Sequence, residues 1–331
     1  MSSVQSVSVT DDDTDIRLDR WFKRHFPNLT HGALEKLLRT GQIRVDGARA
    51  KSNQRVYSGQ IVRVPPLGQL LSAGKKKRIY SSISEYDAAF IQGLVIYMDS
   101  ELIALNKPPG LAVQGGSKTT RHVDAMLDSL RFDGHDRPRL VHRLDRDTSG
   151  VLVIARSAAA AARLGRAFQS HCVEKVYWAL VVGHPECSTG TISAALAKTG
   201  PDGSQRMEWD EDRGKKAVTN YRVVSTAGQK ISWLELTPQT GRTHQLRAHC
   251  ALIKTAIVGD QKYAVKSAHP DQTTDLQKGL LEDVADKMCL HARQIKLNML
   301  GCKPLTITAP LPKHMSIAFK DLGFSEREAE A

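Results

Sequence analysis

The sequence predicts an α+β fold with a mainly antiparallel or mixed β-sheet, preceded by a small basic α+β module. Two observations lead to this prediction. The last two thirds of the chain contain many short segments rich in β-branched and aromatic residues, with few helical segments between them. A regular βαβ series would instead alternate strands with helices. The positive charge is concentrated near the N-terminus, which indicates a separate module.

The basic module is defined by its charge. Residues 16–78 carry 15 Lys and Arg side chains against three acids, within a chain whose formal net charge is +12. This charge density favours a polyanion, and nucleic acid is the commonest polyanion that a protein meets. A solvated basic face that serves only solubility is the alternative.

Helix and turn signals predict the elements of the module. Apolar residues at helical spacing predict a first helix with Asp15 as its N-cap. A second helix is expected to begin after Thr30 and to end at Gly41. The Asp-Gly pair at 46–47 predicts a hairpin, and "SGQIVRVP" predicts a closing strand.

Composition suggests four segments. We expect residues 1–14 to be a disordered acidic lead-in, residues 15–66 to form the basic module, residues 67–91 to be a linker, and residues 92–325 to form the larger domain. Within the larger domain, Ser157 is expected to cap a helix over 158–169, and residues 264–288 are expected to form an insertion.

One stretch places charge against a segment that should be buried. In "LVHRLDRDTSGVLVIA", residues 140–155, Asp145 stands between Arg143 and Arg146 at a turn that leads into an aliphatic strand. Adjacent cations lower the pKa of a carboxylate and keep it ionised when it is partly buried. The alternative is a structural turn whose aspartates cap backbone amides.

A second stretch, "LTPQTGRTHQLRAHC", reads as a strand that ends at Pro238, a turn and a helix. Arg242 and Arg247 are five residues apart and are expected to point in different directions from this helix. His244 and His249 are also five apart, which differs from the HExxH spacing of zinc proteases and favours hydrogen-bonding or packing roles.

Two further observations concern chemistry. Tyr177 lies in the predicted strand "EKVYWALVVG", where a tyrosine is more often a core residue than a catalytic one. The sequence contains no dinucleotide-binding, P-loop or methyltransferase-type glycine motif, so we expect no cofactor, and the cysteine spacing predicts no metal.

Five motifs between Asn106 and Leu297 together resemble a known family. In order they are "NKPPGLAVQGGS", "LVHRLDRDTSGVLVIA", "KVYWALVVG", "TGRTHQLRAH" and "CLHARQIKL". The chain resembles the RluA family of pseudouridine synthases over about residues 15–311, and looks most like the RluC type, which modifies bacterial 23S ribosomal RNA. Residues 15–66 resemble the S4 RNA-binding domain.

The resemblance implies roles for particular residues. Asp145 matches the catalytic aspartate, which acts either as a nucleophile or as a base, and Tyr177 and Arg247 match the other catalytic residues. Arg247 is expected to hold the aspartate in a bidentate pair. Further residues then count as substrate-binding, namely His142, Arg143, Arg242, His244 and Gln245. The residues expected to bind RNA in the S4 domain are Lys36, Arg39, Arg44 and Lys51.

The resemblance also implies a partner and a location. We expect ribosomal RNA as the partner, no membrane association and a monomer. Because the N-terminus lacks the features of a secretory signal, we expect a cytoplasmic protein. Two alternatives are an RNA-binding or ribosome-assembly protein without catalysis and an RluD-type synthase with other rRNA sites. A methyltransferase is a third, disfavoured by the missing cofactor loop.

Overall fold

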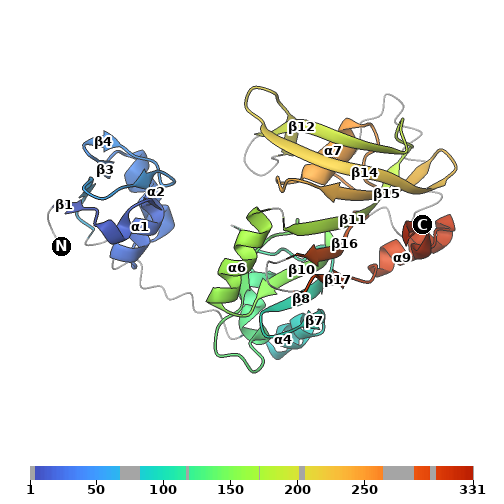
Figure 1. The fold of residues 1–331 in the computed structure, drawn as a ribbon, viewed down its shortest axis with the longest axis horizontal. Coiled ribbons are helices and arrows are strands. Elements are labelled where there is room, and N and C mark those ends of the chain that lie inside the picture. The colour runs from blue at the N-terminus through green and yellow to red at the C-terminus, as the bar shows by residue number, and fades with distance from the viewer. Residues whose placement is uncertain are drawn as a thin grey trace. The chain divides into compact units, whose positions relative to one another are not determined.

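A computed structural model describes residues 4–67, 83–116, 119–170, 172–200, 206–263, 287–298 and 303–330. The chain divides into two compact units, Met1–Ser82 and Ile83–Ala331. Each is described separately below (Figure 1). Among the residues that the structure describes, no helix is long and apolar enough to cross a membrane.

Unit 1 combines two helices with short strands around one apolar core. Its helices are α1 (Leu18–His25) and α2 (His31–Arg39), and its strands are β1 (Gln5–Ser8), β2 (Ile16–Arg17), β3 (Arg44–Val45), β4 (Ala48–Arg49), β5 (Arg55–Val56) and β6 (Ile61–Val64). Four strands pair in the order β1-β6-β3-β4. Trp21 and Phe22 of α1 are buried in the core. The Thr30 hydroxyl caps α2, as predicted, by accepting the Ala33 N–H.

The structure corrects two expectations at the start of unit 1. Residues 1–14 were expected to be a disordered lead-in, but β1 within them pairs with β6. The first helix was expected to start after Asp15, but Ile16 and Arg17 pair instead with β5, and Arg17 is the N-cap of α1. Ile16 and Arg17, which helical spacing had placed in the helix, therefore form a short strand instead.

Unit 2 is built on one large sheet, which confirms the α+β prediction. Its strands are β7 (Val95–Met98), β8 (Leu102–Lys107), β9 (Arg139–Leu140), β10 (Ser149–Ala155), β11 (Val173–Val182), β12 (Thr189–Thr199), β13 (Arg206–Trp209), β14 (Lys215–Ala227), β15 (Ile231–Pro238), β16 (Leu290–Leu297) and β17 (Leu305–Thr308). The order is β13-β12-β14-β15-β11-β16-β10-β8-β7, with β9 and β17 at the sides. The pairing is antiparallel except between β10 and β16, where it is parallel.

Helices cover both faces of this sheet. They are α4 (Glu85–Gln92), α5 (Val123–Met126), α6 (Ala158–Gln169), α7 (Gln245–Leu252) and α9 (Lys313–Leu322), with a 3₁₀ turn η2 (Leu127–Leu130). On β8 and β10, alternate residues pack against α6 on one face and against α4, α5 and η2 on the other. On β11, Trp178 and Leu180 pack towards α9, whereas Ala179 and Val181 pack towards α7.

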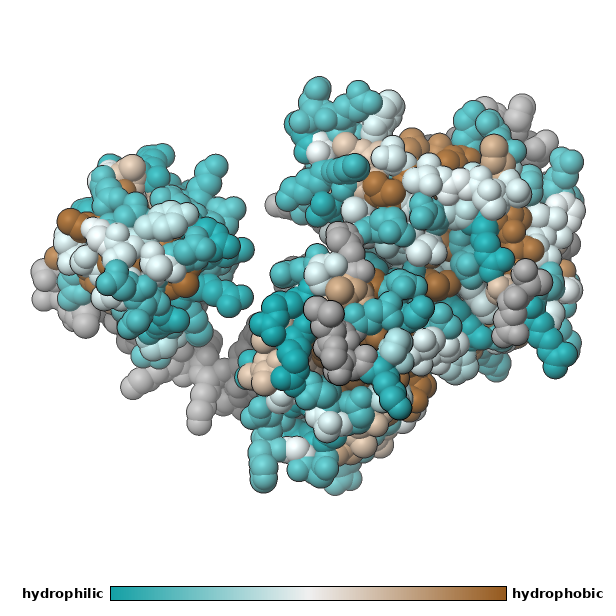
Figure 2. All heavy atoms as spheres, viewed as in Figure 1, coloured by the Kyte–Doolittle hydropathy of each residue, from teal (hydrophilic) through white to brown (hydrophobic). Residues whose placement is uncertain are grey.

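The second unit begins earlier than composition suggested. Ser84 caps α4, and Ile91 of that helix is fully buried in the core of unit 2. Residues 85–91 were assigned to the linker and belong instead to this unit. The expected insertion falls mostly on residues 264–286, which lie outside the described residues. On each unit, hydrophilic residues cover most of the visible surface, and apolar residues form small patches (Figure 2).

Candidate active site

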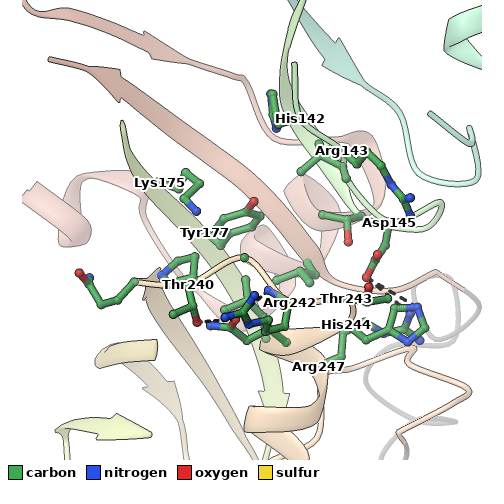
Figure 3. Close-up of a pocket in the computed structure, with 18 of the residues that line it drawn as sticks. His142, Arg143, Asp145, Lys175, Tyr177, Thr240, Arg242, Thr243, His244 and Arg247 are labelled. Atoms are coloured by element: carbon green, nitrogen blue, oxygen red, sulfur yellow. Dashed lines mark hydrogen bonds and ion pairs between the residues drawn. The ribbon is translucent and has the colours of Figure 1, made fainter. Parts of the chain in front are cut away.

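The predicted catalytic residues gather around one cavity of unit 2, with a volume of about 520 Å³. Its wall consists of the loop 142–148, the first residues of β11, and residues 237–247, which run from the end of β15 into α7. Figure 3 shows that Asp145 and Tyr177 lie at this cavity and come from two different elements of the fold. The fold thus brings together the three motifs that carry the predicted catalytic residues.

Asp145 lies in the loop that leads into β10, and its side chain is 24% exposed. This strand is buried throughout. Gly150 in it has a φ of +106°, and a Cβ at this position would lie 2.2 Å from the carbonyl oxygen of Ala292 in β16. Only glycine tolerates both conditions, so the loop that carries Asp145 is followed at once by a closely packed strand.

Lys107 at the end of β8 supports the same loop, although its side chain is fully buried. Its ammonium group donates three hydrogen bonds of 2.9 Å, to the carbonyl oxygens of Pro108, Leu111 and Arg146. Burial lowers the pKa of Lys107 to about 7, although nearby carboxylates oppose this shift. Because Arg146 directly follows Asp145, Lys107 holds the backbone of the candidate aspartate.

Two basic side chains face the Asp145 carboxylate. His244 Nε2 and Arg247 Nη1 each lie 3.9 Å from Asp145 Oδ2. The N-cap of α7 is His244, whose φ of +49° is a strained conformation for a residue other than glycine. Arg247 was expected to form a bidentate pair with Asp145. That expectation is wrong, because the bidentate hydrogen bonds, of 2.6 and 2.7 Å, go to Asp260.

Tyr177 and Lys175 line the cavity from β11, where alternation places both on one face. Burial raises the pKa of the Tyr177 hydroxyl, and the charge of Asp145 raises it further. The hydroxyl is therefore protonated at neutral pH. Burial lowers the pKa of Lys175.

His142 and Arg143 differ in their surroundings. The ring of His142 stacks on Phe168 with a centroid distance of 4.6 Å, and its Nε2 accepts the Val153 N–H at 2.8 Å. Burial, with a smaller effect from the charge of Lys175, lowers the pKa of His142 to about 3, so this ring is a neutral part of the wall. The Arg143 side chain is exposed and also lines the cavity.

Arg242 and Arg247 line the same cavity. The expectation that they point away from one helix in different directions is wrong, because α7 begins only at Gln245 and Arg242 lies in the preceding turn. The Arg242 Nε donates to the Lys216 carbonyl oxygen at 3.1 Å, and the residue is exposed.

Gln245 is held firmly by the protein itself. It is 4% exposed, and its side-chain amide makes four hydrogen bonds within the protein. The oxygen accepts from Thr240 Oγ1 and the Arg242 N–H, and the nitrogen donates to the Val218 carbonyl oxygen and Thr219 Oγ1. These partners occupy both amide atoms, so the side chain of Gln245 fixes the turn before α7, although the residue also lines the cavity.

In unit 1, the four cations predicted to bind RNA are all exposed: Lys36, Arg39, Arg44 and Lys51. The strand register adds two more, because Arg49 and Arg63 stand directly opposite Arg44 on the neighbouring strands. Directly opposed residues share one face of a sheet, where like charges destabilise it. This row of three arginines supports the prediction of a polyanionic ligand.

Three functional candidates were missed in the sequence: Lys107, Asp260 and Tyr263. Lys107 carries a local signal, since it ends an aliphatic strand within the "NKPP" motif. Asp260 and Tyr263 lie 13 and 16 residues beyond Arg247, and only the tertiary structure brings them to it. Within the described ranges, no group of three or more His, Cys, Asp or Glu residues could hold a metal ion.

Several known proteins are similar to this chain in sequence. The sequence matches the model of the RNA pseudouridylate synthase family over residues 101–252. It is 35% identical over 299 residues to Ribosomal large subunit pseudouridine synthase C of Rickettsia prowazekii (strain Madrid E), which covers 89% of this chain and 94% of the relative. It is 32% identical to RNA pseudouridine synthase 4, mitochondrial, of Arabidopsis thaliana, over 96% of this chain and 82% of the relative.

Solved structures show the same fold. The structure titled Human RNA Pseudouridylate Synthase Domain Containing 4 matches with a TM-score of 0.60 and 27% sequence identity, over 72% of this chain and 97% of that chain. The identity to curated relatives extends over nearly the whole sequence. This chain therefore belongs to the RNA pseudouridylate synthase family and is an RNA pseudouridine synthase.

Proposed function

We propose that this protein converts uridines to pseudouridines in 23S, the large-subunit, ribosomal RNA, with Asp145 as the catalytic residue. The observation that carries this proposal is the accessible Asp145 carboxylate, which faces His244 and Arg247 at 3.9 Å within the cavity. The names of the bacterial relatives, which match over 94% and 96% of their own lengths, support the large-subunit target.

The reaction rearranges bonds within one nucleotide. The bond from N1 of uracil to C1′ of the ribose breaks, the base turns, and C5 bonds to C1′, while C5 loses a proton and N1 gains one. Asp145 acts either by attacking the sugar covalently or as a base on the ribose. Arg247 faces the Asp145 carboxylate at 3.9 Å and orients it. The Tyr177 hydroxyl, which is protonated at neutral pH, takes part in removing the C5 proton by passing its own proton to a base such as the Asp145 carboxylate.

The target base must leave its stack to enter the cavity. Flipping a base out costs a few kcal/mol, and planar guanidinium stacking in the vacated space offsets part of this cost. Arg143 suits this role, because it is exposed and comes from the same loop as Asp145.

Unit 1 supplies affinity for the RNA backbone through its exposed cations, including Arg44, Arg49 and Arg63. We also propose that the protein acts as a monomer. Its proposed location is the cytoplasm, where bacterial ribosomal RNA is made.

Pseudouridine mapping of total RNA from cells with and without the protein tests the target. We expect particular 23S rRNA positions to lose pseudouridine when the protein is absent. An unchanged map together with a ribosome-assembly defect would favour an RNA-binding role without catalysis. Loss of modification only in another RNA would overturn the 23S assignment.

A further inference from the structure

A turn outside the five motifs contacts both basic side chains that face Asp145. This turn, residues 259–263, follows a segment that is bonded to the central sheet. The Val258 N–H donates to the Leu180 carbonyl oxygen, and the Cys289 N–H donates to the Val258 carbonyl oxygen. Gly259 has a φ of +75°, and a Cβ there would lie 2.2 Å from the Lys287 carbonyl oxygen. The turn therefore starts from a fixed, closely packed point.

Asp260 fixes the orientation of Arg247. Its carboxylate is fully buried and accepts two hydrogen bonds from Arg247, from Nε at 2.6 Å and from Nη2 at 2.7 Å. It also accepts the backbone N–H groups of Lys262 and Tyr263 at 2.9 and 3.1 Å. Burial alone would lower the pKa of Arg247, but its hydrogen bonds and the charge of Asp260 raise it. With Nε and Nη2 occupied, Nη1 is the guanidinium nitrogen that faces Asp145.

Tyr263 fixes the tautomer of His244. The Tyr263 hydroxyl lies 2.7 Å from the Met207 backbone nitrogen, which can only donate, and 3.1 Å from His244 Nδ1. The hydroxyl accepts from Met207, and its own proton goes to His244 Nδ1. If Nδ1 carried the proton instead, the hydroxyl proton of this buried tyrosine would have no acceptor among the described residues. Neutral His244 therefore carries its proton on Nε2, the nitrogen that faces Asp145.

We propose that Asp260 and Tyr263 are positioning residues, which orient Arg247 and His244 so that both present a proton to the Asp145 carboxylate. This inference rests on the proposed role of Asp145. In this proposal, the side chains of Asp260 and Tyr263 do not contact the substrate themselves. They act through Arg247 and His244, and so orient the Asp145 carboxylate before RNA binds.

The purely structural alternative is that Asp260 and Tyr263 only stabilise the fold. Asp210 offers a matched control, because it too holds an arginine and two backbone amides. It pairs with Arg213 at 2.6 Å and accepts the N–H groups of Asp212 and Arg213, in the turn between β13 and β14. If a carboxylate that holds an arginine and two backbone amides matters only for folding, Asp260→Asn and Asp210→Asn should have equally small effects on the reaction rate.

The first experiment measures the single-turnover rate on rRNA fragments and, separately, the Kd for RNA. We expect Asp260→Asn to lower the rate about 100-fold, as for a catalytic group displaced by about 1 Å, with an unchanged Kd. Asp210→Asn should leave both unchanged. In an Arg247→Gln background, Asp260→Asn should have almost no further effect, because it acts through Arg247. A rate equal to that of Asp210→Asn, or the full loss persisting in the Arg247→Gln background, would overturn the role of Asp260.

The second experiment decides the question even if Asp260→Asn does not fold. It uses ¹⁵N-histidine NMR of the full chain, with the signals of His244 assigned among the 12 histidines through His244→Gln. We expect neutral His244 to carry its proton on Nε2, and we expect Tyr263→Phe to raise its pKa, because a donor to the neutral Nδ1 is lost. A proton on Nδ1 in the wild type, or an unchanged titration in Tyr263→Phe, would overturn the inference. This readout does not depend on activity, so it is separate from any failure of the Asp145 assignment.

Discussion

The Asp145 carboxylate is partly buried among residues that are themselves held firmly. Lys107 holds the backbone beside it through the Arg146 carbonyl oxygen. Arg247 and His244 face its carboxylate at 3.9 Å. A carboxylate so placed is oriented before the substrate arrives, which is the arrangement that lowers a reaction barrier most effectively.

Lys107 offers a test at the residue scale. Lys107→Met removes the ammonium group and leaves three buried carbonyl oxygens without their donor. We expect the free energy of unfolding at neutral pH to fall by about 3 kcal/mol, as measured by urea denaturation. Stability equal to that of the wild type would show that these bonds contribute nothing net.

The same residue predicts a pH dependence. The pKa of Lys107 is about 7 in the folded protein and 10.5 ordinarily, so between these values the unfolded chain binds a proton that the folded chain lacks. Stability from this group therefore rises with pH across this window. Between about pH 7 and pH 8.5 the gain should reach up to about 2 kcal/mol in the wild type and be absent in Lys107→Met. Parallel pH curves for the two proteins would contradict this assignment.

At the residue scale, local motifs singled out residues that the structure brings to one cavity, including Asp145, Tyr177 and Arg247. It did not predict the partner of Arg247. A bidentate pair with Asp145 was a reasonable expectation, but the geometry gives that pair to Asp260. Pairing across a turn depends on backbone placement, which residue spacing alone does not determine.

At the scale of elements, strands with aliphatic or β-branched runs were predicted well, for example β10 and β11. Strand β13, with the sequence RMEW, has no such run and was missed, since its pairing with β12 forms it. The start of α1 was misplaced for a similar reason, because a bridge to β5 competed with local helical spacing. Local propensity fails where tertiary pairing decides.

Gly150 provides a test at this scale. Gly150→Ala would force a side chain into a φ of +106° and against the backbone of β16. We expect unfolding free energy to fall by at least about 3 kcal/mol and activity to fall with it. Gly165→Ala in α6 is the matched control, because a Cβ there meets nothing within 4 Å. This control should be neutral or stabilising by up to about 1 kcal/mol. Equal stability of the two variants would refute the close-packing argument.

At the scale of the whole molecule, charge and chemistry are divided between the two units. Unit 1 carries a dense set of exposed cations, and unit 2 carries the cavity with Asp145. This division was predictable from charge distribution and from the motifs. The boundary between the units was not predictable, because helix α4 has few sequence features that distinguish it from a linker. The packing of Ile91 in the core assigns this helix to unit 2.

The role of unit 1 can be tested by measuring how RNA affinity depends on salt concentration. We expect replacement of Lys36, Arg39, Arg44 and Lys51 by Gln to weaken RNA binding and to reduce the slope of log K against log salt by about 3. Replacing the exposed lysines of α9, Lys313 and Lys320, should change the slope by less than about 1. Equal slopes for both sets of variants would remove the RNA-binding role from unit 1.

The most direct test of the central claim is pseudouridine formation by Asp145→Asn on rRNA fragments, measured at saturating enzyme alongside RNA affinity and unfolding free energy. Asparagine keeps the size of the side chain and removes the charge that Arg247 and His244 face. We predict no detectable pseudouridine, with RNA affinity and stability close to those of the wild type. Normal turnover by this variant would contradict the assignment of Asp145 as the catalytic residue.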